Sequence, residues 1–365
     1  MIKCFIQPFI LGAIICGGLT YSIKLIAERM KLFDQPSPRK VHTSATPRLG
    51  GVAIILSFLL LVIGYSLAST RLHFDSNHIL FFDQRLFGVV LGAIILMVAG
   101  VIDDIRGLKP WQKLIWQISA AISVVAFGIT IDYIRLPAGY HIELTSWIIN
   151  LQFWGQIFNI SVWGDLLTIF WIVLLINTLN FLDGLDGLAS GISFIAGLVV
   201  FFLSLALGQG ASALLAIIFA GVVLGFIPWN FNPAKIFMGD SGSMFLGFML
   251  AVLSVISGGK LATSFLVLGI PVLDVGWVVV RRLLSGHSPF QADKMHFHHR
   301  LLTTGLTQKQ AVILLYLISA AFGAVAVLTS TQEKFKAIYW LVALMVSFAI
   351  GLIILEWKKR GKNAQ

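Results

Sequence analysis

Long apolar stretches alternate with short polar connections along this chain. A transmembrane helix needs about 20 consecutive apolar residues, and the chain contains eleven candidate stretches. They are centred near Ile14, Leu60, Leu96, Ile122, Val173, Leu198, Phe219, Leu250, Val275, Leu317 and Phe348. The pattern predicts an all-α polytopic membrane protein with about 11 transmembrane helices, built as one integral membrane domain over residues 1–365.

The composition excludes an ordinary soluble protein. The chain is 58% hydrophobic and 12% charged, with a mean hydropathy of +0.92, whereas a soluble domain is about 25% charged. The first apolar stretch is too long for a cleaved signal sequence, so we interpret it as a retained span. Cys4 and Cys16 both lie in that stretch, where we expect neither a disulfide nor a metal site.

The polar connections form two alternating sets that differ in charge. The first set is 28–49, 103–113, 180–187, 228–241, 281–308 and the tail from Lys358. The second set is the N-terminus, 69–85, 132–165, 208–210, 257–263 and 329–335. The first set holds 17 Lys and Arg and the second holds six, so the positive-inside rule places the first set in the cytoplasm.

This assignment puts the N-terminus outside and the C-terminus in the cytoplasm. The net charge of +10 then faces anionic lipid or anionic substrate, and no nucleic acid is needed to explain it. The aromatic connection 132–165 is expected to be a loop on the outer interface.

The most informative polar run is 177–187, which lies between two apolar stretches. It contains Asn177, Asn180, Asp183 and Asp186, together with two glycines. Such groups are costly beside hydrocarbon, which favours a functional role over a simple polar turn. Acidic oxygens beside glycine turns suit a hard cation such as Mg2+, and Mg2+ suits phosphate chemistry. The two aspartates share a face if the run is helical, and can wrap an ion if the glycines break the helix.

Asp103 and Asp104 end the third apolar stretch. Adjacent residues of a helix point about 100° apart, so we expect the two carboxylates to differ in role, one binding metal and the other accepting a proton. The alternative is a solvated helix end with Arg106 as partner. Acidic residues at a helix C-terminus oppose the helix dipole, which weakens that alternative.

A glycine-rich segment, 237–243, precedes the eighth stretch and contains Asp240 and Ser241. Either residue could simply cap the following helix. The helix N-terminus could instead bind a diphosphate, which an aspartate would repel unless a cation lay between them. The segment therefore also indicates Mg2+.

Two further segments are basic. The loop 293–300 supplies many donors for phosphate oxygens, although a metal-binding tract or a lipid-headgroup patch is the alternative. Its basic residues are Lys294, His296, His298, His299 and Arg300. The segment 38–51 could be only a basic loop after the first span. Thr307 and Gln310 predict a capping box at the start of the tenth stretch.

Five of these segments, in this order, resemble the motifs of the polyprenyl-phosphate N-acetylhexosamine-1-phosphate transferase family, glycosyltransferase family 4. They are 38–51, 103–104, 180–189, 237–242 and 296–299. The last motif reads His-Phe-His-His and looks like the branch that uses UDP-N-acetylglucosamine, the undecaprenyl-phosphate N-acetylglucosaminyl 1-phosphate transferases. The family moves a sugar phosphate from a UDP-sugar to a membrane polyprenyl phosphate and releases UMP.

The resemblance implies a Mg2+-dependent phosphotransferase with defined roles for its acidic residues, and Mn2+ is the alternative ion. Asp240 would be the direct metal ligand, with Asp186 as the second. Asp103, Asp104, Asp183 and Asp186 would be the catalytic carboxylates, and Asp103 would position or deprotonate the lipid phosphate.

The resemblance also implies a set of substrate-binding residues. These are Asn177, Asn180, Asn230, Phe237, Lys113, His296, His298, His299 and Arg300. Phe237 would stack on the uracil and Asn230 would hydrogen-bond the uridine. Lys113 matches a basic position that faces the active cleft, and the histidines would contact the diphosphate or the sugar.

The implied reaction transfers N-acetylglucosamine 1-phosphate from UDP-N-acetylglucosamine to undecaprenyl phosphate. It would be the first membrane step of a cell-envelope polysaccharide, such as O-antigen, enterobacterial common antigen or a teichoic acid linkage unit. The expected location is the bacterial cytoplasmic membrane, with the active site on its cytoplasmic face. The partners are then the UDP-sugar, the polyprenyl phosphate and membrane lipid, and a homodimer remains open.

Two alternatives are kept. The same chemistry could use another UDP-N-acetylhexosamine or UDP-N-acetylmuramoyl-pentapeptide as donor. A carrier or flippase for an anionic lipid would place ionisable residues near mid-membrane, whereas the residues found here cluster at helix ends.

Overall fold

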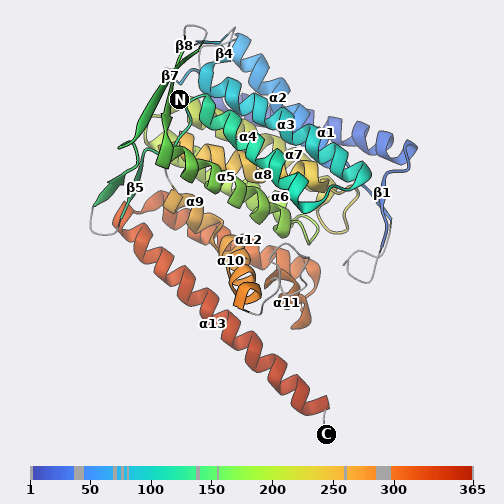
Figure 1. The fold of residues 1–365 in the computed structure, drawn as a ribbon. Coiled ribbons are helices and arrows are strands. Elements are labelled where there is room, and N and C mark those ends of the chain that lie inside the picture. The colour runs from blue at the N-terminus through green and yellow to red at the C-terminus, as the bar shows by residue number, and fades with distance from the viewer. Residues whose placement is uncertain are drawn as a thin grey trace.

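The computed structural model describes residues 3–36, 45–68, 72–74, 78–79, 82–136, 140–153, 156–258, 261–284 and 297–363. Long helices dominate it (Figure 1). The helices are α1 (Lys3–Arg29), α2 (Gly50–Ala68), α3 (Gln84–Arg106), α4 (Pro110–Ala126), α5 (Val162–Leu182), α6 (Leu188–Ala206), α7 (Gly210–Asn230), α8 (Gly239–Ile256), α9 (Leu261–Val267), α10 (Gly269–Leu284), α11 (Phe297–Thr303), α12 (Gln308–Leu328) and α13 (Thr331–Asn363).

The prediction of a membrane protein with many apolar helices is confirmed. Within the described residues, eight helices are long and apolar enough to cross a membrane, or nine if the pair Leu261–Val267 and Pro271–Val278, bent by 85°, forms one span. Every predicted centre lies on a helix. The helix around Ile122 is α4, which has 17 residues. The count of eleven and the orientation of the termini therefore stay predictions.

Among the described residues, four two-stranded antiparallel hairpins accompany the helices. They pair β1 (Phe33–Asp34) with β2 (Thr46–Pro47), β3 (His78–Ile79) with β4 (Phe82–Asp83), β5 (Tyr133–Arg135) with β6 (His141–Glu143), and β7 (Ile148–Phe153) with β8 (Gln156–Ser161). The connection 132–165, expected as a loop, thus contains two hairpins. Its β-branched and aromatic residues favour strands, and pairing satisfies backbone groups that a loose interfacial loop would leave open.

The centre of the bundle is formed by α7 and α8. In α8, 83% of the most apolar 18-residue window is buried, compared with 17% in α1. Helices α2, α3 and α5 pack on α8, while α1 and α6 pack on α7. Small residues permit the closest approaches, because a side chain added at Gly51 would overlap the backbone of Gly242, and one at Gly100 would overlap Ser241.

The alternation of helix directions sorts the connections to two ends of the bundle. The α3–α4 turn, the α5–α6 turn and the segment before α8 lie at one end, while hairpins β5 to β8 lie at the other (Figure 1). Helix α1 begins at the hairpin end, and α13 runs from that end to the opposite side. Three connections of the first, basic set, the α3–α4 turn, the α5–α6 turn and the segment before α8, are thereby collected at one end.

Candidate active site

Four aspartates from three helix ends form an acidic cluster: Asp103, Asp104, Asp183 and Asp240. Asp103 and Asp104 lie in the last turn of α3, and Asp183 follows the last residue of α5. Asp240 lies in the first turn of α8. Close packing of α3 and α5 on α8 brings the three segments together. We call these four residues the acidic cluster.

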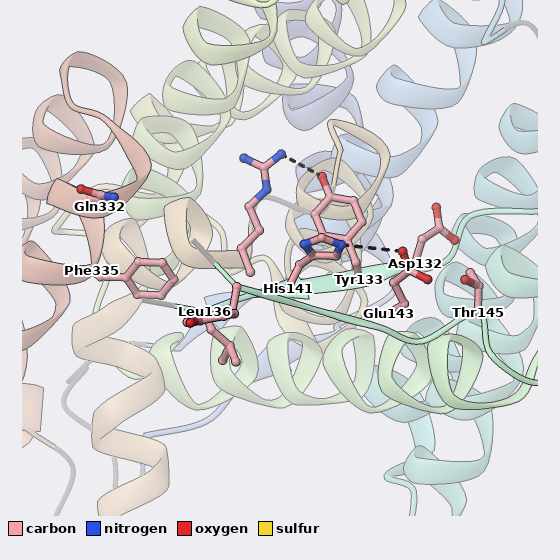
Figure 2. Close-up of a pocket in the computed structure, with 10 residues that line it drawn as sticks. Asp132, Tyr133, Leu136, His141, Glu143, Thr145, Gln332 and Phe335 are labelled. Atoms are coloured by element: carbon pink, nitrogen blue, oxygen red, sulfur yellow. Dashed lines mark hydrogen bonds and ion pairs between the residues drawn. The ribbon is translucent and has the colours of Figure 1, made fainter. Parts of the chain in front are cut away.

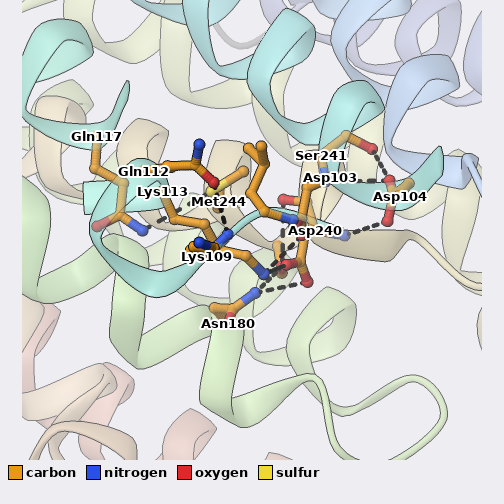
Figure 3. A network of polar contacts seen from close by, with 12 residues as sticks. Asp103, Asp104, Lys109, Gln112, Lys113, Gln117, Asn180, Asp240, Ser241 and Met244 are labelled. Atoms are coloured by element: carbon orange, nitrogen blue, oxygen red, sulfur yellow. Dashed lines mark hydrogen bonds and ion pairs between the residues drawn. The ribbon is translucent and has the colours of Figure 1, made fainter. Parts of the chain in front are cut away.

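Lys113, from the first turn of α4, pairs with two members of the acidic cluster (Figure 3). Its Nζ lies 2.6 Å from Oδ2 of Asp103 and also forms an ion pair with Oδ2 of Asp240. The other oxygen of Asp103 accepts a hydrogen bond from the backbone N–H of Leu108 at 2.6 Å. One carboxylate therefore holds both the α3–α4 turn and the lysine in place.

Asp104 makes different contacts from its neighbour Asp103, as their separation around the helix leads one to expect. Its Oδ1 accepts from the backbone N–H of Asp240 at 3.0 Å, and its Oδ2 accepts from the Ser241 hydroxyl at 3.0 Å. Asp104 thus caps the N-terminus of α8 from another helix, where its charge complements the helix dipole. Gly239 has φ +69° and stands against this carboxylate, so a side chain there would collide with it.

Asn180 fixes the remaining oxygen of Asp240. Its Nδ2 donates to Asp240 Oδ1 at 3.0 Å and to the Ser243 hydroxyl at 2.9 Å. Asn177 lies one turn before Asn180 on α5, and its Nδ2 donates to Gln117 Oε1 at 2.8 Å. Sequence reasoning did not identify Gln117 or Ser243. A glutamine within an apolar stretch was the available signal, because a buried amide needs a partner.

Asp183 is the acidic residue with the least direct pairing. Within the described part of the chain, no hydrogen bond reaches its carboxylate. Burial raises the pKa of Asp183 well above its usual range, and the charges of Asp240, Asp104 and Asp186 raise it further, in that order. Arg48 opposes this effect. Asp183 therefore presents an open carboxylate beside Asp240.

Asp186 and Asn230 tie the α5–α6 turn to the segment before α8. Asp186 Oδ2 accepts from Asn232 Nδ2 at 2.9 Å and from the backbone N–H of Ala234 at 3.1 Å. Asn230 is 1% exposed, and its Oδ1 accepts from the Gly187 backbone N–H at 3.2 Å. Both side chains border the site through these ties, and the structure does not join Asp186 directly to Asp240. Asn232 was not identified from the sequence.

The segment of Phe237 pairs with the described part of the basic 38–51 motif. The Phe237 backbone N–H donates to the Pro47 carbonyl at 2.9 Å, and its carbonyl accepts from Gly50 at 2.9 Å. Arg48 forms an ion pair with Asp34, and its charge also acts on the acidic cluster. Two motifs nearly 200 residues apart in the sequence are thus adjacent in the structure.

The histidine motif is only partly described. His296 and residues 37–44 lie outside the described residues, and the side chains of His298 and His299, on α11, are not described either. Arg300 is partly buried on the same helix. Their predicted contacts with diphosphate or sugar stay predictions.

The acidic cluster fits a hard cation in charge. Lys113 pairs with Asp103 and Asp240, and the charge of Arg48 acts on Asp104 and Asp183, so two cations stand against four carboxyl groups. Among the described residues, no three His, Cys, Asp or Glu side chains are arranged as a ready metal site. Mg2+ keeps several waters and uses one or two carboxylates plus substrate phosphates, so a complete protein cage is not required. Asp240 and the open Asp183 are the best-placed carboxylates.

Comparison with known proteins gives one consistent group. Residues 86–258 match the model of glycosyl transferase family 4. The chain is 32% identical to a probable undecaprenyl-phosphate N-acetylglucosaminyl 1-phosphate transferase of Bacillus subtilis, over 94% of this chain and 90% of that protein. It is 34% identical to a decaprenyl-phosphate N-acetylglucosaminephosphotransferase of Mycobacterium tuberculosis, over 86% and 80%. It is also 34% identical to a phospho-N-acetylmuramoyl-pentapeptide-transferase of Staphylococcus aureus, over 71% and 78%.

Proposed function

The chain belongs to glycosyl transferase family 4, and from this we propose that it transfers N-acetylglucosamine 1-phosphate from UDP-N-acetylglucosamine to undecaprenyl phosphate, releasing UMP. The observation that carries the proposal is the acidic cluster at one end of the helices, in which Lys113 pairs with Asp103 and Asp240. The chain is also similar, over most of its length, to relatives that are named for that reaction.

Bound Mg2+ would neutralise the diphosphate and stabilise the charge on the departing UMP. We propose that Asp240 holds it, with Asp183 or the predicted Asp186 as the second carboxylate; Mn2+ is the alternative ion. Asn180 keeps the Asp240 carboxylate in one orientation, because it binds the oxygen that Lys113 does not. Removal of divalent metal should therefore abolish turnover.

The proposed reaction is a direct displacement. An oxygen of the acceptor phosphate forms a bond to the β-phosphorus of the nucleotide sugar, while the bond from that phosphorus to the bridging oxygen breaks and UMP leaves. Asp103 positions or deprotonates the acceptor phosphate, and Lys113 turns its ammonium toward the diphosphate oxygens. A covalent route with an aspartate nucleophile is the competing mechanism. Isolation of a phosphorylated enzyme without acceptor would contradict direct attack.

The biological setting is part of the same proposal. The reaction would begin a cell-envelope polysaccharide such as O-antigen, enterobacterial common antigen or a teichoic acid linkage unit. The excess of Lys and Arg in the connections at the acidic end supports a cytoplasmic active site in the bacterial cytoplasmic membrane. UDP-sugars are soluble, so a site at helix ends rather than at mid-membrane suits such a donor.

A second donor is supported by one specific observation. The similarity to the Staphylococcus aureus protein makes UDP-N-acetylmuramoyl-pentapeptide the main competitor as donor. The test measures Mg2+-dependent UMP release from radiolabelled UDP-N-acetylglucosamine in vesicles with undecaprenyl phosphate, with each unlabelled donor added as competitor. Competition by UDP-N-acetylglucosamine alone is the expected result. Folded protein that releases no UMP from any UDP-sugar would leave a carrier as the better interpretation.

A further inference from the structure

A large cavity lies at the end of the bundle opposite the acidic cluster. Its volume is about 760 Å³, which is within the usual range for ligand pockets. Four segments meet around it: 133–135, 207–209, 257–258 and 329–330. Segments 133–135 and 257–258 follow α4 and α8, whose first turns carry Lys113 and Asp240, so the cavity is separate from the candidate active site.

The wall of this cavity is mainly apolar and extends into the bundle. Its apolar and aromatic lining includes Trp171, Leu203, Leu261, Phe265, Phe335 and Ile338. Trp171 lies nine residues after the start of α5, which corresponds to a depth of roughly 13 Å at the rise of an α-helix. The shape and lining suit a hydrocarbon chain.

A buried lysine stands at this cavity without a counter-ion. Lys334, near the start of α13, is 8% exposed, and its Nζ donates to the Thr263 hydroxyl at 3.3 Å. In the part of the chain that the structure describes, no ion pair includes Lys334 and no acidic residue lines the cavity. The adjacent Glu333 is exposed and is not part of the cavity lining; its carboxylate accepts from the backbone and hydroxyl of Ser330 at 3.0 and 3.2 Å, and forms no ion pair with Lys334 among the described residues. A buried ammonium in this state calls for an anionic partner.

A neighbouring cavity differs from this one in the charge of its lining. A second cavity of about 690 Å³ lies beside the first and shares Tyr133, Arg135 and Phe335 with it. The lining of that second cavity contains two acidic residues, Asp132 and Glu143, beside Arg135 and His141 (Figure 2). Arg135 lines both cavities, whereas Lys334 lines only the first, which has no acidic residue in its described lining. The charge of the first cavity therefore favours an anion.

We propose that the Lys334 cavity binds an anionic phospholipid, with a phosphate oxygen accepting from Lys334 and one acyl chain lying along the wall toward Trp171. The phosphate completes the pairing of the lysine, and the chain fills apolar space. Free phosphate would pair with the lysine but would leave the apolar wall unfilled. A zwitterionic phospholipid would fill the wall, but the positive charge of its own headgroup would weaken the pairing of its phosphate with the lysine. An anionic phospholipid satisfies both requirements of the cavity.

Native mass spectrometry of the full-length protein tests this proposal. The protein is released from mixed micelles that contain dioleoylphosphatidylglycerol and dioleoylphosphatidylcholine in equal amounts. We expect wild type to retain the anionic lipid about tenfold more than the zwitterionic one, as a charge-assisted contact allows. Lys334→Met should lose this preference. Lys336→Met, an exposed lysine two residues further along α13, is the matched control and should behave as wild type.

A second variant and a stability measurement keep the test decisive. Ala262→Phe places a ring in the cavity while keeping Lys334, and should also lower retention of both lipids. In neutral detergent, phosphatidylglycerol should raise the Tm of wild type, whereas inorganic phosphate at the same concentration should not. Equal anionic preference in wild type and Lys334→Met would overturn the proposal. So would unchanged retention in Ala262→Phe, or a Tm rise with phosphate alone that matches the lipid.

Discussion

Replacing Lys113 by methionine is expected to remove most activity while the fold is kept. The ammonium stands between Asp103 and Asp240 and links the last turn of α3 to the first turn of α8. Methionine keeps the apolar stem and removes only the charge and its donors. Two carboxylates then face each other without the cation between them.

The size of the effect follows from the exposure and number of these contacts. The Lys113 side chain is 27% exposed, and those of Asp103 and Asp240 are 7% and 28% exposed. Contacts to charged groups contribute about 1.5–3 kcal/mol each, and partial exposure reduces that value. If one such contact passes to the diphosphate in the transition state, its loss costs about 2 kcal/mol, or roughly thirtyfold in kcat/KM.

The assay is the initial rate of UMP release at saturating Mg2+, with the Tm of each purified variant measured alongside. Lys109→Met is the matched control, because Lys109 is an exposed lysine one turn earlier at the same end of the bundle. We expect the control to retain at least about half of the wild-type rate. Should Lys113→Met work within threefold of wild type at an unchanged Tm, the reasoning about this lysine is refuted.

Three other changes test the site and the packing that builds it. Asp240→Asn should abolish Mg2+-dependent UMP release while expression is retained, and near-normal turnover would contradict its proposed metal role. The pKa of Asp183 is raised in the folded protein, so the folded protein binds this proton more tightly than the unfolded chain does. The folded state therefore loses stability as the pH rises from about 4, the pKa of an unfolded Asp, through the raised pKa. Asp183→Asn should therefore raise the Tm at neutral pH without Mg2+ and leave it little changed at pH 4, whereas a lower Tm at neutral pH would argue against this. Gly51→Val should lower the free energy of unfolding by about 1–3 kcal/mol or more, because the new side chain forces α2 away from α8. Gel filtration should show loss of folded protein for this variant. The control Gly64→Val, on the same helix but facing open space, should remain monodisperse.

Local patterns predicted much of the helical fold and the type of chemistry. Helix length and apolar content are properties of neighbouring residues, so every predicted span centre falls on a helix. The capping box at Thr307 and Gln310 is confirmed, with reciprocal bonds of 3.3 and 2.9 Å. The acidic motifs were also visible, because charge beside an apolar stretch is conspicuous.

Other features were ambiguous in the sequence. The sequence predicts a loop for the aromatic connection 132–165, whereas the structure contains two strand pairs there, because its residues suit strands equally well. Asn230 was assigned to uridine by resemblance, whereas in the structure it ties Gly187 and Ile236. The sequence alone does not distinguish an asparagine that binds a ligand from one that bonds to the protein backbone.

The sequence by itself therefore determined that the chain spans a membrane and carries carboxylates at helix ends. Only the tertiary structure decided which carboxylate meets which partner. Lys113 and Asp240 are 127 positions apart, and Lys334 lies 71 positions from Thr263. The first pairing depends on the packing of α3 and α4 on α8, and the second on the packing of α13 on α9. Packing between helices is not encoded by any local pattern.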